Sequence, residues 1–207
     1  QETNARSERY LQAMFRRRYK YRHFVGHKDK WGAERFGYLS RYPLKDLEFL
    51  SPRYGLFGSY WATCQIGDWE VRLVNVHLTP VVVRRGSRLT DALQALTTAE
   101  QTHAAEINQI AEHLDEDMPT IVAGDFNSLS SFSAPKRLRE LEFVDSMDSV
   151  VEDADEQATW QWPTRPLPLR LRIDYIFHSP HFETKSSQVL DITGSDHRLV
   201  LSQLQLP

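Results

Sequence analysis

Residues 119–127 read Pro-Thr-Ile-Val-Ala-Gly-Asp-Phe-Asn, and this segment predicts the centre of the fold. Its β-branched pair indicates a buried strand, which Gly124 ends. Asp125 and Asn127 follow two positions apart, so an extended backbone would point both side chains the same way. A carboxylate and an amide would then share the rim of a sheet, where open α/β sheets bind ligands. The alternative is a local turn in which both side chains bond only the backbone.

The composition is that of an ordinary globular protein. The chain has 207 residues, of which 41% are hydrophobic and 26% charged, so we expect one domain over residues 1–207. A formal net charge of −3 argues against a polycation that coats nucleic acid or an anionic membrane, although local basic patches are compatible with it. With Cys64 as the one cysteine, an intrachain disulfide and a cysteine-rich metal site are both excluded. No apolar run approaches the roughly 18 residues of a membrane-spanning helix, and the compartment stays open between cytoplasmic and exported or membrane-associated.

Hydrophobic periodicity and turn residues predict a mixed α/β chain. The expected strands are 36–40, 59–66, 69–78, 171–177 and 199–206, and the expected helices are 4–20, 89–114 and 130–142. Several of these strands are apolar on both faces, which favours sheets that are covered on both sides. We expect a turn at 143–146 and a solvated acidic loop at 152–156.

Polar side chains lie at the predicted ends of several strands. His77 closes one strand, and Asp174 interrupts the apolar run 173–177. A lone histidine is commonly a core residue, but an ionised carboxylate in a buried strand is costly unless it is paired. His197 is the candidate partner of Asp174. Acids, amides and histidines at one sheet edge would suit a divalent cation and a phosphate.

An ordered set of short motifs spans nearly the whole chain. In chain order they are Gln1-Glu2, Leu39-Ser40-Arg41-Tyr42-Pro43, Asn75-Val76-His77-Leu78, Gly124-Asp125-Phe126-Asn127, Thr159-Trp160, Arg172-Ile173-Asp174-Tyr175-Ile176 and Gly194-Ser195-Asp196-His197. Together they resemble the endonuclease/exonuclease/phosphatase superfamily, the relatives of DNase I, neutral sphingomyelinases and inositol-polyphosphate phosphatases. The resemblance implies an α/β fold, a four-layer α/β/β/α sandwich of the DNase I type. Its first strand would lie before Gln1, so we expect the natural protein to extend beyond this residue.

The resemblance also implies a metal site. Glu2 resembles the family's Mg²⁺ ligand, and Asp196 resembles the aspartate close to the metal and the phosphate. Mg²⁺ prefers one or two carboxylates together with water and substrate oxygens, so few protein ligands are needed. We expect Mg²⁺ as the cofactor, with Mn²⁺ as a substitute.

Five residues resemble the family's catalytic set. His197 resembles the catalytic histidine, and Asp174 the carboxylate that orients it. Asp125 and Asn127 resemble the pair that aligns the attacking water and the phosphoryl oxygens, and His77 the second histidine that contacts phosphate. A carboxylate beside His197 would favour its protonated form. Whether His197 acts as the base or as a clamp on phosphate stays open, because Asp125 is a rival base.

These residues predict a metal-dependent phosphoesterase that hydrolyses a phosphomonoester, phosphodiester or pyrophosphate of a small or lipid-linked substrate. The chain is compact and lacks an insertion rich in lysine and aromatic residues that would follow a DNA groove. A lipid-linked substrate would be bound at a membrane surface. The alternative is a DNA endonuclease or repair nuclease, for which arginines at 16–22, 84–88, 165, 170 and 172 would contact the nucleic acid backbone. The arginines at 16–18 would otherwise complement a helix dipole. A remote alternative is an inactive binding module on the same fold. The sequence does not indicate an obligate protein partner.

Overall fold

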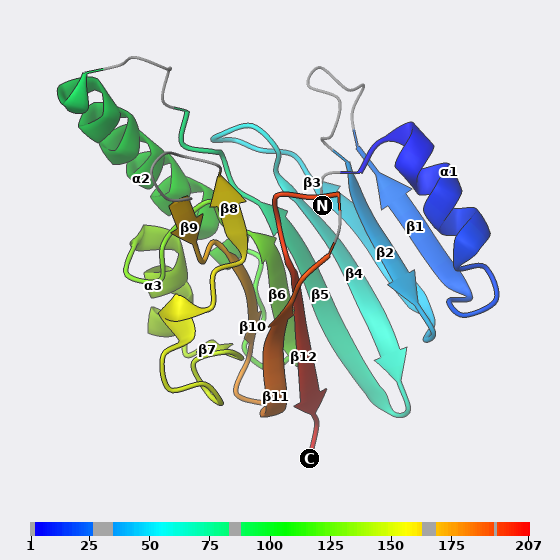
Figure 1. Ribbon diagram of the computed structural model, residues 1–207. Helices are drawn as coiled ribbons and strands as arrows, with labels where there is room; N and C mark the ends of the chain where they lie inside the picture. Colours follow the sequence, from blue (N-terminus) through cyan, green and yellow to red (C-terminus); the bar gives the residue numbers. More distant parts are fainter. Residues whose placement is uncertain (1–2, 27–34, 83–87, 163–168, 193) are drawn as a thin grey trace.

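The computed structural model describes residues 3–26, 35–82, 88–162, 169–192 and 194–207. A six-stranded sheet forms its centre, with the strand order β3-β4-β5-β6-β10-β7 (Figure 1). These strands are β3 (Leu44–Leu50), β4 (Ser59–Ile66), β5 (Trp69–His77), β6 (Thr120–Asp125), β10 (Asp174–His178) and β7 (Val144–Asp145). Neighbours are antiparallel except β5 and β6, which are parallel and are joined by a long helical crossover.

Two helices, α2 (Leu89–Ala111) and α3 (Ser133–Glu140), cover one face of the sheet (Figure 1). Because side chains alternate along a strand, Val74 and Val76 of β5 both point to this face and pack with Ile107 of α2. Full burial of each such side chain contributes about 1.5–3 kcal/mol. In the part of the chain that the structure describes, no helix is long and apolar enough to cross a membrane.

Two β-hairpins form a further layer on the opposite face of the sheet, and α1 (Ala5–Met14) lies outside the first of them (Figure 1). The hairpin strands are β1 (Tyr21–Val25) with β2 (Phe36–Ser40) and β11 (Glu183–Leu190) with β12 (Leu199–Gln205). A cavity of about 290 Å³ lies between the hairpins, over β5, β6 and β10. A third short pair joins β8 (Trp160–Trp162) to β9 (Leu169–Leu171). The layers are therefore helix, sheet, hairpins, helix, which is the predicted α/β/β/α order.

Several predicted elements are wrong in detail. The strand expected at 171–177 is two strands in different sheets, β9 and β10, which Arg172 and Ile173 separate. The expected turn at 143–146 contains β7, and the acidic loop contains a short 3-10 helix, η1 (Ala154–Glu156). The first helix ends at Met14, so the arginines at 16–18 lie just beyond its last turn and not inside the helix as expected.

Candidate active site

Three of the predicted site residues occupy one row across the central sheet. His77 on β5 is the register partner of Asp125 on β6, and Asp125 is in turn the partner of Asp174 on β10. Adjacent strands lie about 4.8 Å apart, so this register places the three side chains next to one another. The sheet thus brings together residues that are far apart in the sequence.

The segment after Gly124 turns rather than staying extended. Gly124 has φ +148°, and a Cβ there would lie 1.9 Å from the carbonyl oxygen of Val76, so only glycine fits. Asn127 has φ +47°, and its backbone N–H donates to Asp125 Oδ1 at 2.8 Å. Its Nδ2 donates to Asp125 Oδ2 at 3.1 Å and to the Leu78 carbonyl at 2.9 Å. The backbone is a local turn, as in the alternative interpretation, and not extended. The side chains bond each other as well as the backbone, so the turn still brings the carboxylate and the amide together.

His197 reaches the row from the segment before β12. A β-bridge to Trp160 and a backbone bond from Arg198 to Thr159 hold this segment beside β8. His197 Nδ1 lies 3.0 Å and 3.2 Å from the two oxygens of the buried Asp174 carboxylate. The partner that sequence analysis expected for this carboxylate is therefore in place. With Nδ1 on Asp174, the Nε2 atom of His197 faces Asp125 Oδ2 at 3.9 Å.

His77 approaches the same oxygen from the other side. Its Nε2 lies 3.8 Å from Asp125 Oδ2, and its ring stacks on Phe57 with centroids 4.0 Å apart and planes 12° apart. Burial, with a smaller contribution from His197, lowers the pKa of His77 to about 3. His77 is therefore a neutral imidazole near pH 7, with one ring nitrogen to donate and one to accept.

Sequence reasoning gave no role to three residues that shape this site. Thr159 Oγ1 accepts hydrogen bonds from the N–H groups of Ile173 and Asp174, each at 3.0 Å, and so fixes the start of β10. Trp160 Nε1 donates to Asp196 Oδ2 at 3.1 Å. The motif Thr159-Trp160 was a signal for both, whereas nothing in the sequence singled out Phe57 beside His77.

Among the described residues, one group of three could hold a metal ion. It consists of Asp125, Asp174 and His197, whose ligand atoms lie within 4.8 Å of one another. The two carboxylates fit a hard cation such as Mg²⁺, whereas imidazole suits softer metals better. Asp196 is exposed next to His197, and Glu2 lies outside the described residues. Their assignment as metal ligands stays a prediction.

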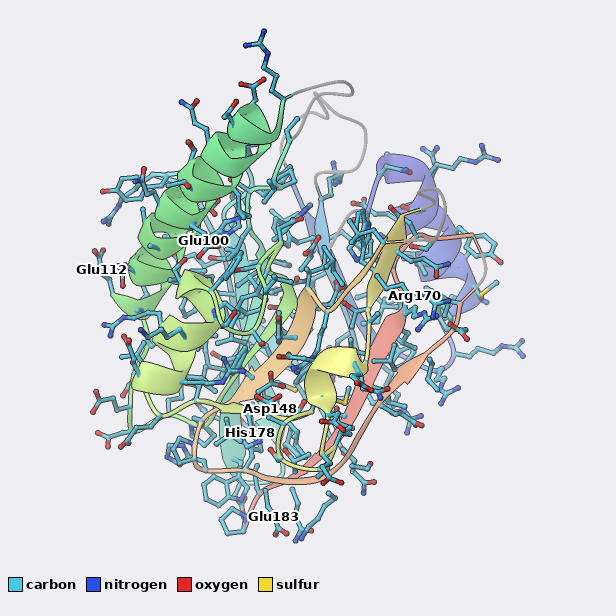
Figure 2. The ribbon with its side chains drawn as sticks, turned by 60° about the vertical axis from the view of Figure 1, so that its left-hand side comes forward. Glu100, Glu112, Asp148, Arg170, His178 and Glu183 are labelled. Atoms are coloured by element: carbon cyan, nitrogen blue, oxygen red, sulfur yellow. The ribbon has the colours of Figure 1, made fainter. Side chains whose placement is uncertain are left out.

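The arginines proposed to contact a nucleic acid backbone do not share one environment. Arg172 is 3% exposed and forms ion pairs with Asp145 and Asp148, so its predicted contact with a nucleic acid is wrong. Arg170 on β9 is exposed (Figure 2). Arg165 and residues 84–87 lie outside the described residues.

Comparison with known proteins identifies the family of this chain. The Endonuclease/Exonuclease/phosphatase family profile matches residues 1–197. The chain belongs to this family. Members of the endonuclease/exonuclease/phosphatase family are generally hydrolases of phosphoester bonds, and they usually use divalent metal ions. Among curated proteins, no sequence matches this chain.

Solved structures of the family share the fold at low sequence identity. The 3′ phosphatase NExo from Neisseria, bound to product DNA hairpin, is 19% identical with a TM-score of 0.68, over 99% of this chain and 86% of that one. TDP2 from D. rerio, complexed with single strand DNA product, is 16% identical with a TM-score of 0.69, over 99% and 84%. An endonuclease/exonuclease/phosphatase from Bacteroides vulgatus is 16% identical with a TM-score of 0.68, over 100% and 83%. The predicted DNase I-like fold is confirmed.

Proposed function

We propose that this chain is a Mg²⁺-dependent phosphoesterase that hydrolyses a phosphomonoester, phosphodiester or pyrophosphate of a small or lipid-linked substrate. One observation carries the proposal. Two imidazole Nε2 atoms converge on one carboxylate oxygen, Asp125 Oδ2, at 3.8 Å and 3.9 Å. These distances are too long for direct hydrogen bonds and too short to hold an atom on the line between the groups, so a substrate oxygen or a water would contact the nitrogen atoms and this oxygen from the side.

Asp174 and His197 act as a pair. Asp174 accepts from Nδ1 of His197, which fixes the ring and directs Nε2 at the space next to Asp125. In its neutral form this Nε2 takes a proton from the attacking water, and in its charged form it holds a phosphoryl oxygen. Asp125 is the rival base, because its Oδ2 faces the same space.

Asn127 and His77 hold the phosphoryl group in this proposal. Neutral His77 donates through Nε2 without adding a charge. Asn127 Nδ2 donates to Asp125 Oδ2 and to the Leu78 carbonyl, so one of these bonds would have to give way for the amide to donate to a phosphoryl oxygen. Carboxylates would hold Mg²⁺. Family resemblance favours Glu2 and Asp196, and position favours Asp125 or Asp174. The metal would neutralise charge on the non-bridging oxygens of the phosphoryl group.

A DNA endonuclease or repair nuclease is the second candidate. It is favoured by two similar structures that contain DNA products. The small-substrate proposal is favoured by the net charge of −3 and by the burial of Arg172, which removes one arginine from any contact with a nucleic acid backbone. A lipid-linked substrate would add contact with a membrane surface.

A panel of four substrates separates these candidates: plasmid DNA, bis-p-nitrophenyl phosphate, a phosphomonoester and a lipid pyrophosphate, each with Mg²⁺ and with EDTA. We expect phosphate to be released from a small or lipid-linked substrate in Mg²⁺ and not in EDTA. We expect no nicking of the plasmid. Mg²⁺-dependent nicking that falls steeply with salt would favour the nuclease. Inactivity on all four substrates would contradict the phosphoesterase proposal.

A further inference from the structure

A series of polar residues on α2 lies behind the site. Every third residue in the middle of this helix is polar and faces the protein: Glu100, His103, Glu106 and Gln109. His103, Glu106 and Gln109 are at most 6% exposed. A buried carboxylate such as Glu106 is costly unless hydrogen bonds compensate it, so its partners indicate what it is for.

The partners of Glu106 lie in two loops. Its carboxylate accepts from the backbone N–H of Thr79 at 3.2–3.3 Å and from Thr79 Oγ1 at 2.8 Å. The backbone of Leu56 also bonds to Glu106, and the Leu56 N–H lies 3.0 Å from Thr79 Oγ1. Burial raises the pKa of Glu106, and these hydrogen bonds oppose that shift. One buried carboxylate thus fastens the turn after β5 to the loop before β4.

One of the two rings that stack in the site lies in the loop before β4, and the other lies at the end of β5, next to the turn. Thr79 follows His77 by two residues, and Leu56 directly precedes Phe57, whose ring lies on the His77 imidazole. The packing around the carboxylate is tight. Gly55 has φ +70°, and a Cβ there would lie 1.8 Å from Glu106 Oε1. A shift of either loop would therefore displace His77 relative to Phe57 and to Asp125.

We propose that Glu106 is a positioning residue for His77. It holds the turn at Thr79 and the loop at Leu56 in the one arrangement that stacks His77 on Phe57 and directs Nε2 at Asp125. His103 supports the same turn, because its Nε2 lies 2.6 Å from the Thr79 carbonyl oxygen. The consequence for turnover rests on the proposed function, whereas the placement of the ring does not.

The test compares Glu106→Gln with Glu112→Gln. Glu112 is the C-cap residue of the same helix and lies on its outer side (Figure 2), where its carboxylate is exposed and accepts from Arg53 Nη1 at 2.8 Å. The glutamine at 106 offers one acceptor and places an NH₂ group among donors, so the two loops should separate. Thr79→Val, which replaces the hydroxyl with a methyl group, is a milder second variant if Glu106→Gln folds poorly.

Two readouts are measured on folded protein. The first is the ¹H–¹³C NMR signal of the His77 ring, assigned with His77→Gln, because stacking on Phe57 shifts its ring protons upfield. We expect Glu106→Gln and Thr79→Val to move this signal toward the position of an unstacked histidine, while Glu112→Gln leaves it unchanged. The second is hydrolysis of bis-p-nitrophenyl phosphate, for which we expect Glu106→Gln to lower kcat about 10- to 100-fold with little change in KM.

Each outcome decides the proposal. A variant at 106 that loses stability but keeps the wild-type His77 signal and kcat would show that Glu106 is only structural. If the wild-type protein hydrolyses no phosphoester, the proposed function fails, and the His77 signal alone then decides whether Glu106 positions the ring.

Discussion

Two clusters of buried charge lie close together in this protein and are built differently. In the first, Arg172 Nη2 lies 2.6 Å from each oxygen of Asp145, and Nη1 lies 3.0 Å from Asp148. In the second, only two residues further along the chain, Asp174 pairs with His197 at 3.0 Å, but Asp125 Oδ2 is 3.8 Å and 3.9 Å from the two imidazoles. The first cluster is closed by ion pairs at hydrogen-bond distance. In the second, which we call the open cluster, Asp125 accepts hydrogen bonds from Asn127, but neither imidazole is within hydrogen-bond distance of Oδ2.

The difference separates a structural role from a chemical one. A buried ion pair with short contacts on several oxygens has satisfied its charges within the protein. A carboxylate flanked by imidazoles beyond hydrogen-bond distance leaves their polar atoms able to contact a third group from the side, which in our proposal is a phosphoryl oxygen or a water. Damage to the closed cluster should reduce stability, and damage to the open cluster should reduce turnover.

The largest expected effect is on turnover, from Asp125→Ala and His197→Ala. Each removes a group that faces the open space, so kcat on the preferred phosphoester should fall by about 10³-fold or more. The free energy of unfolding should fall by no more than about 1–2 kcal/mol. Steady-state kinetics and urea unfolding on the same preparations check both parts, and near-normal turnover in either variant would contradict the site assignment.

The next largest effect is on stability, from Arg172→Met. This change leaves the buried Asp145 with only the more distant Arg139, whose Nη2 lies 3.5 Å from Oδ2, and should lower the free energy of unfolding by about 3 kcal/mol. The double variant Arg172→Met with Asp145→Leu removes both charges and should recover most of that loss. Urea unfolding of the wild type, the single variant and the double variant measures these differences in the free energy of unfolding. A single variant as stable as the wild type would mean that the closed cluster does not hold the fold.

A smaller effect is expected from Asp174→Asn, which keeps the shape of the side chain but removes its charge. His197 would lose the carboxylate that fixes its ring, so kcat should fall about 100-fold and the pH–rate profile should shift. The profile is measured from pH 5 to pH 9, a range chosen to bracket ordinary histidine titration at about 6.5. An unchanged profile would argue against the pairing.

The smallest effect is a pH dependence of stability that comes from His77. Burial lowers its pKa from 6.5 to about 3 in the folded protein, so the unfolded chain binds the proton more readily between these values. The stability contribution is present above pH 6.5 and is lost as the pH falls, by about 1.5 kcal/mol between pH 6.5 and pH 5. Urea unfolding at both pH values should show this slope in the wild type and less of it in His77→Phe. Equal slopes would contradict the burial of a neutral imidazole.

The open cluster was easier to predict from the sequence than the closed one. Asp174 stood out because a carboxylate inside an apolar run needs a partner, and His197 was available. Arg172 lies in the same motif, but sequence alone could not show that it points to Asp145 and Asp148, because that depends on how β7 pairs with β10. The sequence therefore groups Arg172 with the arginines predicted to contact phosphate, and its buried ion pairs show that this prediction is wrong.

Parts of the fold were predictable for a physical reason. β2 and β4 have the predicted bounds, because apolar runs between turn residues define a strand locally. β1, β3, β8 and β11 were missed, and β3 and β11 are largely exposed, so hydrophobic alternation gives them little signal. The stacking of Phe57 on His77 depends on a loop held by Glu106, a contact between residues far apart in the chain.

The most direct test of the central claim is hydrolysis of bis-p-nitrophenyl phosphate by the wild-type protein and by Asp125→Ala, each with Mg²⁺ and with EDTA. The account predicts turnover by the wild type in Mg²⁺, its loss in EDTA, and its loss in Asp125→Ala although that variant unfolds cooperatively like the wild type. Turnover that survives EDTA, or that survives in a folded Asp125→Ala, would contradict the claim that the open cluster is a metal-dependent phosphoesterase site.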